Sequence, residues 1–148
     1  MSTRSRPIAG VGNRAGDAQT AAEMALVLLS LAIAFGFCRL FYGWSWFPTL
    51  ALAAVASHLL AIFCRRRGLG LVLSSIASLA GLALFTSLAF YRDSSAFGLP
   101  TRGTWHALTD DLASGWHDFG TAIALVEPRT GFMVAAVFAI WLSAFLAD

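Results

Sequence analysis

The side chains that could do chemistry in this chain are few and widely separated. There are three histidines, His58, His106 and His117, and two cysteines, Cys38 and Cys64. Neither cysteine has a histidine or another cysteine at metal-ligand spacing, and we interpret both as small apolar side chains. His106 and His117 are separated by about three helical turns, which is too far for them to share a metal ion. We expect both to be exposed in a loop.

His58 differs from the others because it lies in an uncharged run. No Asp, Glu, Lys or Arg occurs in residues 40–64. A helix that begins near Phe47 would carry His58 about 16 Å inward, close to the middle of a bilayer. We expect a neutral histidine there to hydrogen-bond to another helix. The candidate partners are serines of the next apolar run: Ser74, Ser75 and Ser78. The alternative is a proton pathway, for which the spans offer no second titratable group at that depth.

The sequence shows no arrangement of residues typical of an active site. It has no Ser/His/Asp or Cys/His grouping, no phosphate-binding loop and no set of metal ligands. We therefore predict no catalytic, cofactor-binding or metal-binding residues in this chain, and no cofactor.

The elements that hold these side chains are apolar helices. Of the 148 residues, 58% are hydrophobic and 12% are charged, whereas a soluble domain has about 25% charged residues. A helix of about 20 apolar residues crosses the hydrocarbon core of a bilayer. We predict an all-α membrane protein with four transmembrane helices, at about residues 21–42, 47–64, 70–91 and 131–147. The expected partner is the lipid bilayer; a net charge of +2 does not suggest nucleic acid.

Three consecutive arginines, Arg65, Arg66 and Arg67, predict the orientation. Positive loops stay on the cytoplasmic side, so we place this connection and the tail of residues 1–20, expected to be disordered, in the cytoplasm. The tail and this connection hold six arginines, against three in the loop of residues 92–130, which we expect to be extracytoplasmic. The expected location is the plasma membrane. Arg39, near the outer end of the first span, is expected to extend toward the headgroups.

The outer loop contains an amphipathic pattern. Apolar residues recur at helical spacing: Trp105, Leu108, Leu112, Trp116 and Phe119. They predict a helix over about residues 104–119, capped by Thr101 or Thr104. Three acidic residues are expected on its other faces: Asp110, Asp111 and Asp118. The helix either lies flat among the outer headgroups or packs against another part of a larger protein, and the sequence leaves both open.

Small residues recur at four-residue spacing within the spans and predict close helix packing. The sets are Ala53/Ser57/Ala61, Ser74/Ser78, Ala77/Gly81 and Ala135/Ala139/Ser143. The partner helices belong either to this chain or to other helices that it meets.

Several short motifs carry a resemblance to a known family. In the outer loop they are Gly98-Leu99-Pro100-Thr101, Thr104-Trp105, Leu108, Asp111-Leu112 and Trp116. Later motifs are Glu127-Pro128, Gly131-Phe132, Trp141 and Ala144-Phe145-Leu146-Ala147-Asp148, and earlier ones are Arg39-Leu40-Phe41, His58-Leu59-Leu60 and Arg65-Arg66-Arg67. Over about residues 24–148 the chain resembles the N-terminal membrane region of transglutaminase-like membrane proteins of the TgpA type, as found in actinobacteria.

The resemblance implies a non-catalytic role. Members of that family have several N-terminal membrane helices, then an extracytoplasmic transglutaminase-like domain with a Cys-His-Asp triad, and usually one more helix. Cys38, Cys64 and the histidines match none of the triad motifs, so no catalytic residue is carried over. The resemblance implies an N-terminal anchoring domain that positions an outer domain absent from this chain. The last helix ends at a single Asp148, and we expect the chain to be the first part of a longer protein.

Two other functions remain open at this point. The chain could be a stand-alone four-helix membrane protein, either a small pore-former or an accessory subunit of a membrane complex. It could also be a fragment of a transporter with His58 in its pathway. The sequence does not determine the oligomeric state.

Overall fold

The computed structural model describes residues 11–39, 41–95, 99–120 and 127–147. Within these ranges the protein is all α-helical. Four helices are long and apolar enough to cross a membrane: α1 (Val11–Gly36), α2 (Phe47–Arg66), α3 (Leu71–Phe90) and α5 (Thr130–Ala147). A shorter helix, α4 (Arg102–Phe119), lies between the last two. Two 3₁₀ turns, η1 (Phe37–Arg39) and η2 (Arg92–Ser94), follow α1 and α3. The predicted fold class is therefore confirmed.

The first helix begins earlier than the sequence pattern indicates. It starts at Val11, so residues 11–20, which we expected to be disordered, are helical, and the apolar span within it is Asp17–Gly36. Alanine and glutamine are good helix formers, and a span already folded beside them removes the cost of helix nucleation. Residues 1–10 of the expected tail lie outside the described residues.

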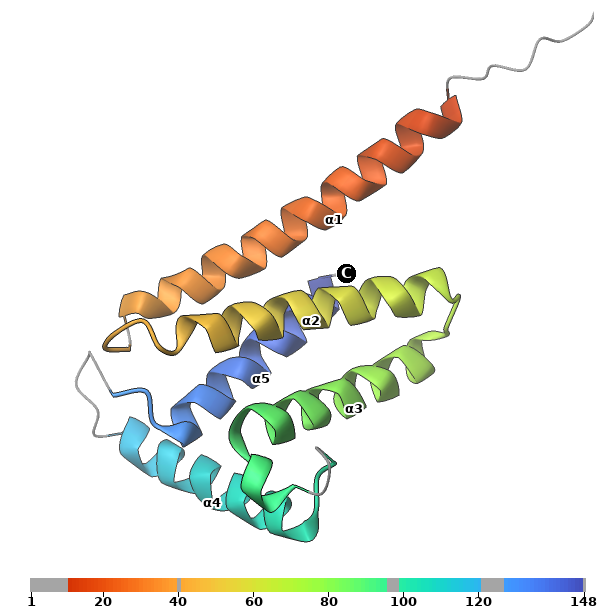
Figure 1. Cartoon of the computed structure of the whole chain (residues 1–148). Helices are drawn as coiled ribbons and strands as arrows, with labels where there is room; N and C mark the ends of the chain where they lie inside the picture. Colours follow the sequence, from red (N-terminus) through yellow and green to blue (C-terminus); the bar gives the residue numbers. More distant parts are fainter. Residues whose placement is uncertain (1–10, 40, 96–98, 121–126, 148) are drawn as a thin grey trace, which may run out of the picture.

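Helices α2 and α5 are central to the bundle, because each contacts all the other spanning helices. Figure 1 shows α1 beside α2, with the N-terminal part of α1 extending beyond the other helices. The turn between α2 and α3, with Arg65–Arg67, lies at one end of the bundle, which we call the arginine end. The turn between α1 and α2 lies at the opposite end, called the aromatic end after Phe41, Trp44 and Trp46 (Figure 1).

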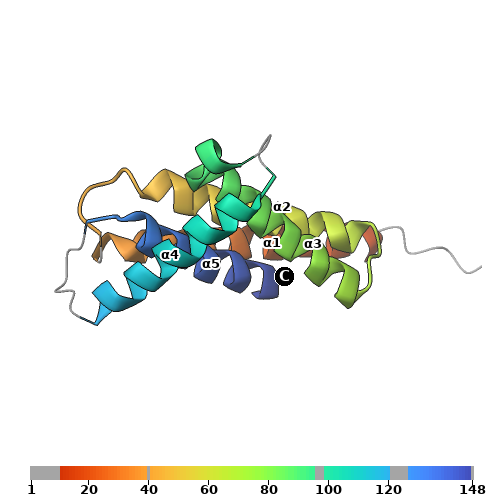
Figure 2. The same cartoon turned by 90° about the horizontal axis from the view of Figure 1, so that it is seen from below.

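Helix α4 lies obliquely across the bundle near the aromatic end and packs mainly against α5. Figures 1 and 2 both show it crossing α5 near the start of that helix and near the end of α3. The described parts of the loop of residues 92–130 therefore fold back onto the spanning helices. The loop residues 96–98 and 121–126 lie outside the described residues.

At the arginine end, α2 is terminated by a glycine, Gly68. Gly68 adopts a left-handed backbone with φ of 64° directly after the C-cap of α2. The amide of Gly68 donates to the carbonyl of Arg65 at 3.0 Å, and the amide of Leu69 donates to that of Cys64 at 3.1 Å. This pair of bonds is the Schellman motif, in which glycine avoids the steric penalty of a side chain. It reverses the chain within a few residues and keeps the three arginines at the membrane edge.

The aromatic end is held by packed aromatic rings. Gly43, with φ of 78°, makes the turn, and the indole nitrogen of Trp46 donates to the Gly43 carbonyl at 2.6 Å. The Trp46 ring packs against Phe41 and Phe47 and is almost completely buried. Pro48 follows in the first turn of α2, where its missing amide hydrogen costs nothing. Below this cluster, Leu50, Val137 and Trp141 fill the core between α2 and α5.

Candidate functional site

A row of hydrogen bonds near the middle of the bundle joins all four spanning helices. Ser30 Oγ of α1 lies 2.8 Å from Nε2 of His58 on α2, with the donor set by the tautomer of the ring. The next residue, Ser57, donates its hydroxyl to the Trp141 carbonyl of α5 at 2.8 Å. The Trp141 indole nitrogen in turn donates to the Ser78 hydroxyl of α3 at 3.2 Å. We call these five buried residues the polar layer.

The partner of His58 differs from the prediction. The expected serines lie on α3, but Ser74 and Ser75 donate to backbone carbonyls of the preceding turn, and Ser78 accepts from Trp141. Ser30 on α1 is bonded to His58 instead. Sequence position gives the depth of a side chain along a helix, whereas its direction around the axis depends on which neighbour each face meets. On α2, the face of Ser57 meets α5 and that of His58 meets α1.

The polar layer is suited to fixing the register of the helices. A helix that slid in hydrocarbon would lose these bonds without compensation from water, and each such bond between membrane helices contributes about 0.6 kcal/mol on average. The His58 side chain is only 1% exposed and gives no access to solvent or substrate. The layer therefore has the burial of a packing element.

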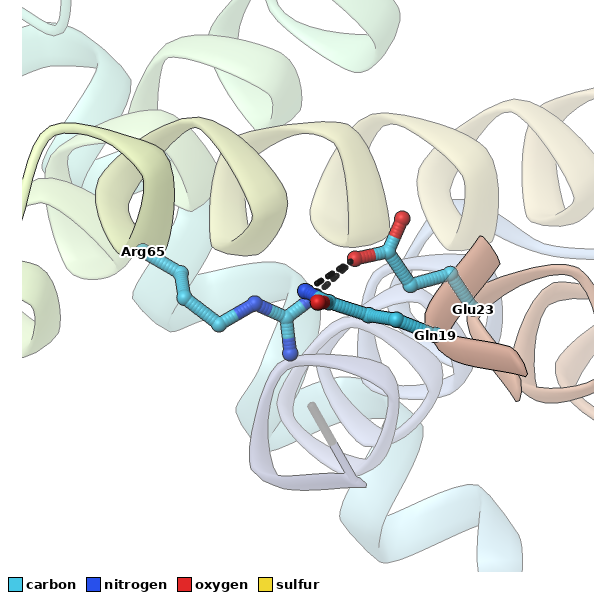
Figure 3. Close-up of polar contacts among 3 residues, drawn as sticks. All are labelled: Gln19, Glu23 and Arg65. Atoms are coloured by element: carbon cyan, nitrogen blue, oxygen red, sulfur yellow. Dashed lines mark hydrogen bonds and ion pairs between the residues drawn. The ribbon is translucent and has the colours of Figure 1, made fainter. Parts of the chain in front are cut away.

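A second polar contact ties α1 to α2 at the arginine end. Nη2 of Arg65 lies 2.7 Å from Oε1 of Glu23, and the side-chain amide of Gln19 donates to the same oxygen at 3.4 Å. Figure 3 shows the guanidinium reaching from the end of α2 to the carboxylate on α1. The two side chains are 40% and 12% exposed, so solvent screening keeps this pair within about 1 kcal/mol.

Sequence reasoning did not anticipate this ion pair. Arg65 was interpreted only as an orientation signal. The information needed was present, because Glu23 and Arg65 both fall at the same end of adjacent antiparallel spans. An acid and a base placed at equal depth on neighbouring helices are expected to pair, since each reduces the cost of burying the other.

Helix α4 begins at the predicted cap. Thr101 accepts from the Thr104 amide at 3.3 Å, and the Thr101 amide donates to the Thr104 hydroxyl at 3.1 Å, which is a reciprocal capping box. Both hydroxyls also reach the carbonyl of Ser94 in η2, at 2.7 and 2.9 Å. The cap therefore fixes the start of α4 to η2, the turn that follows α3.

The face of α4 that meets the bundle includes only part of the predicted apolar face: Leu108 and Leu112 pack against it, and the two tryptophans do not. Thr104 and Leu108 are buried, but Trp105 and Trp116 are 63% and 82% exposed. Asp111, expected on another face, accepts a hydrogen bond from the Tyr91 hydroxyl at 2.7 Å. Burial, and then this carboxylate, raise the pKa of Tyr91 above its usual value. The structure shows α4 packed on the chain's own bundle with the indoles of Trp105 and Trp116 exposed, which leaves both predicted alternatives untested.

The backbones of α4 and α5 touch where they cross. Gly115 and Gly131 face each other, and a Cβ on Gly115 would lie 3.3 Å from the Gly131 carbonyl carbon. A Cβ on Gly131 would overlap the carbonyl oxygen of Asp111. At Gly131 only glycine allows this approach, whereas a Cβ on Gly115 would require its neighbour to shift by a few tenths of an ångström.

The remaining candidate residues are dispersed. Arg39 is exposed in η1, as expected for a side chain that extends toward headgroups, and His106 and His117 are exposed on α4. Cys64 is buried and reduced in the last turns of α2, and η1, which includes residue 38, lies at the other end of the bundle. Across the described residues, no three His, Cys, Asp or Glu side chains are close enough to hold a metal ion.

Together these features define a multi-pass α-helical membrane protein in which α4 is docked near one end of the bundle. Comparison with known proteins adds no closer assignment: no family model, curated protein or solved structure matches the chain.

Proposed function

We propose that this chain is a non-catalytic membrane-anchoring domain that positions an extracytoplasmic domain of the transglutaminase-like kind. The proposal rests on how the polar side chains in the spans are hydrogen-bonded. Ser30, Ser57, His58 and Ser78 are bonded across helix interfaces and are almost fully buried. Such a bundle can hold a fixed shape in the bilayer, which is what an anchor requires.

The docking of α4 supports the same role. A loop helix that is capped onto η2, bonded through Asp111 to Tyr91 and packed against Gly131 is held at several points. A domain attached near this helix would have a defined position relative to the membrane. The link to the transglutaminase-like family rests on the short sequence motifs, many of which lie in or next to α4.

We further propose that the arginine end faces the cytoplasm and that α4 lies on the extracytoplasmic side of the plasma membrane. The positive-inside rule supports this orientation, because Arg65, Arg66 and Arg67 form the dense positive cluster of the described turns. The exposed indoles of Trp105 and Trp116 suit the outer headgroup region.

The other candidate functions are less well supported. The interior of the bundle is filled by Leu50, Val137 and Trp141, which does not favour a pore formed by a single chain. A transport pathway through His58 would require access that its burial does not provide. A role as an accessory subunit of a membrane complex has no specific contact in its favour.

The proposal is tested on the native protein. An antibody against the α4 peptide, residues 101–119, is used to probe membranes of the source cells. An anchor for an outer domain predicts a polypeptide clearly larger than 148 residues, shortened when protease is added to intact cells. It also predicts that the larger product reacts with an impermeant thiol-directed inhibitor outside the cell. A product of only 148 residues would contradict the anchoring role.

A further inference from the structure

A hollow of about 340 Å³ lies between α3 and α4, and we call it the α3–α4 groove. Its walls are mainly carbon: Leu82 and Ala83 of α3, Leu108 of α4 and Phe138 of α5 contribute to them. Protein interiors rarely leave voids larger than a water molecule, and ligand pockets begin at about 300 Å³. The groove is therefore large enough to hold a ligand.

Four residues with hydroxyl groups line the groove; three of these hydroxyls are engaged within the protein, and the fourth residue, Ser87, is only 1% exposed. Thr86 donates to the Leu82 carbonyl at 2.8 Å, Tyr91 to Asp111 at 2.7 Å, and Thr104 to the Ser94 carbonyl at 2.9 Å. Each of these three donors is thus turned to an internal acceptor. A polar ligand entering here would lose its hydration and gain no equivalent bonds from these groups. The groove favours an occupant that is hydrocarbon.

The groove opens on the surface that faces the bilayer. Leu79 and Trp105 line it and remain 59% and 63% exposed. Leu79 lies in the apolar span of α3, and Tyr91 directly follows the end of that span. The groove therefore runs from within the hydrocarbon layer toward the membrane edge at the aromatic end. An occupant can enter sideways from the lipid.

Two cations lie next to the polar end of the groove. Arg92 directly follows Tyr91, and Arg102 stands between the lining residues Pro100 and Thr104. Both side chains are exposed, and Arg102 is in the first turn of α4, where the helix dipole adds positive potential. Guanidinium groups bind phosphate through paired N–H donors. Asp93 is adjacent to Arg92, and Asp111 accepts a hydrogen bond from Tyr91. The positive charge that would meet the phosphate of a lipid whose tail lies in the groove is therefore that of Arg102 at the start of α4.

We propose that the α3–α4 groove binds an acyl chain of a phospholipid from the leaflet at the aromatic end, with the phosphate beside Arg102. The size of the hollow agrees with this occupant: an α-helix with side chains is about 10–12 Å across and would not enter, whereas a single extended chain would. The site is separate from the polar layer. It does not depend on which face of the membrane is cytoplasmic or on the anchoring role.

The test compares two alanines on α3. Ala83 lines the groove, and Ala80 is also exposed on α3 but does not line it. The protein is purified from membranes in mild detergent, delipidated by repeated washing, and analysed by native mass spectrometry for retained phospholipid. We expect one retained phospholipid per chain in the wild type and in Ala80→Phe, and loss of it in Ala83→Phe, where the ring fills the hollow. Arg102→Gln should weaken retention about ten-fold or more, by removing a charge-assisted phosphate contact.

Several results would overturn the proposal. Equal retention in Ala83→Phe and Ala80→Phe would place any bound lipid elsewhere on the surface. A wild-type dimer that Ala83→Phe dissociates would show a second copy in the groove, and a retained fatty acid without a phosphate would exclude the role of Arg102. Far-UV circular dichroism verifies that each variant is folded. If Ala83→Phe is not folded, Leu79→Trp fills the groove from an exposed position and must show the same loss.

Discussion

Ser30 Oγ and His58 Nε2 lie 2.8 Å apart near the middle of two adjacent spanning helices, and both side chains are buried. The contact joins α1, which has few other polar contacts within its span, to α2, which touches every other spanning helix. Together with the Glu23–Arg65 ion pair, it therefore helps to place the first helix against the bundle.

Breaking the Ser30–His58 contact should lower the unfolding free energy of the bundle by a small amount, and the effects of substituting the two residues should not be additive. In a double-mutant cycle with Ser30→Ala and His58→Ala, we expect a coupling free energy of about 0.6 kcal/mol and at most about 1.7, the range for hydrogen bonds between membrane helices. Reversible unfolding in bicelles by steric trapping measures it. Ser75→Ala is the matched control, because that hydroxyl bonds within its own helix. Additive single effects would show that the two side chains do not interact.

Adding a methyl group at Gly131 should detach α4 from α5. A Cβ there overlaps the Asp111 carbonyl, and overpacking of this kind costs about 1–3 kcal/mol. Hydrogen exchange of the α4 amides should become faster in Gly131→Ala. Gly103→Ala is the control, since its Cβ would meet only Thr101 Oγ1 at 3.6 Å, an ordinary contact. If α4 exchanges equally slowly in both variants, the close crossing is not needed for docking.

The Tyr91–Asp111 bond should make the docking of α4 sensitive to alkaline pH. The pKa of Tyr91 is raised in the folded protein, chiefly by burial and then by Asp111. A raised pKa means that the neutral phenol is favoured on folding, so its contribution is complete below the unfolded pKa of about 10 and declines as the pH rises above it.

We therefore expect the unfolding free energy of the wild type to fall above pH 10, and that of Tyr91→Phe to fall less. At neutral pH, Tyr91→Phe should lower the unfolding free energy by about 1–2 kcal/mol, because the hydrogen bond to a carboxylate is lost. Tyr42→Phe is the control, because Tyr42 is exposed. If the unfolding free energy falls equally above pH 10 in Tyr91→Phe and in Tyr42→Phe, groups other than Tyr91 cause the fall.

The sequence was sufficient to predict the spanning helices and the start of α4. Uncharged runs of membrane length are unambiguous, and Thr101 with Thr104 forms the cap that the pattern indicated. The faces of the helices were harder to predict. Spans in lipid are apolar all round, so hydrophobicity does not distinguish a packed face from a lipid-facing one.

The small-residue sets illustrate this limit. Ala53, Ser57 and Ala61 are buried as expected, but Ala135, Ala139 and Ser143 are exposed, and α5 instead packs through larger side chains such as Val137 and Trp141. The same limit explains the missed partner of His58. On α4, the two tryptophans dominated the apolar pattern, yet Thr104, Leu108 and Asp111 make the contacts, because the capping box and Tyr91 orient the helix.

The orientation of the bundle is the central claim and has a direct test. In a background with Cys38→Ala and Cys64→Ala, a single cysteine is placed at Ala113, exposed on α4, or at Gly70, exposed at the arginine end. An impermeant thiol reagent is added to intact cells and again after permeabilisation. We predict that Ala113→Cys reacts in intact cells and that Gly70→Cys reacts only after permeabilisation. The reverse labelling pattern would place α4 in the cytoplasm and contradict the proposed anchoring of an outer domain.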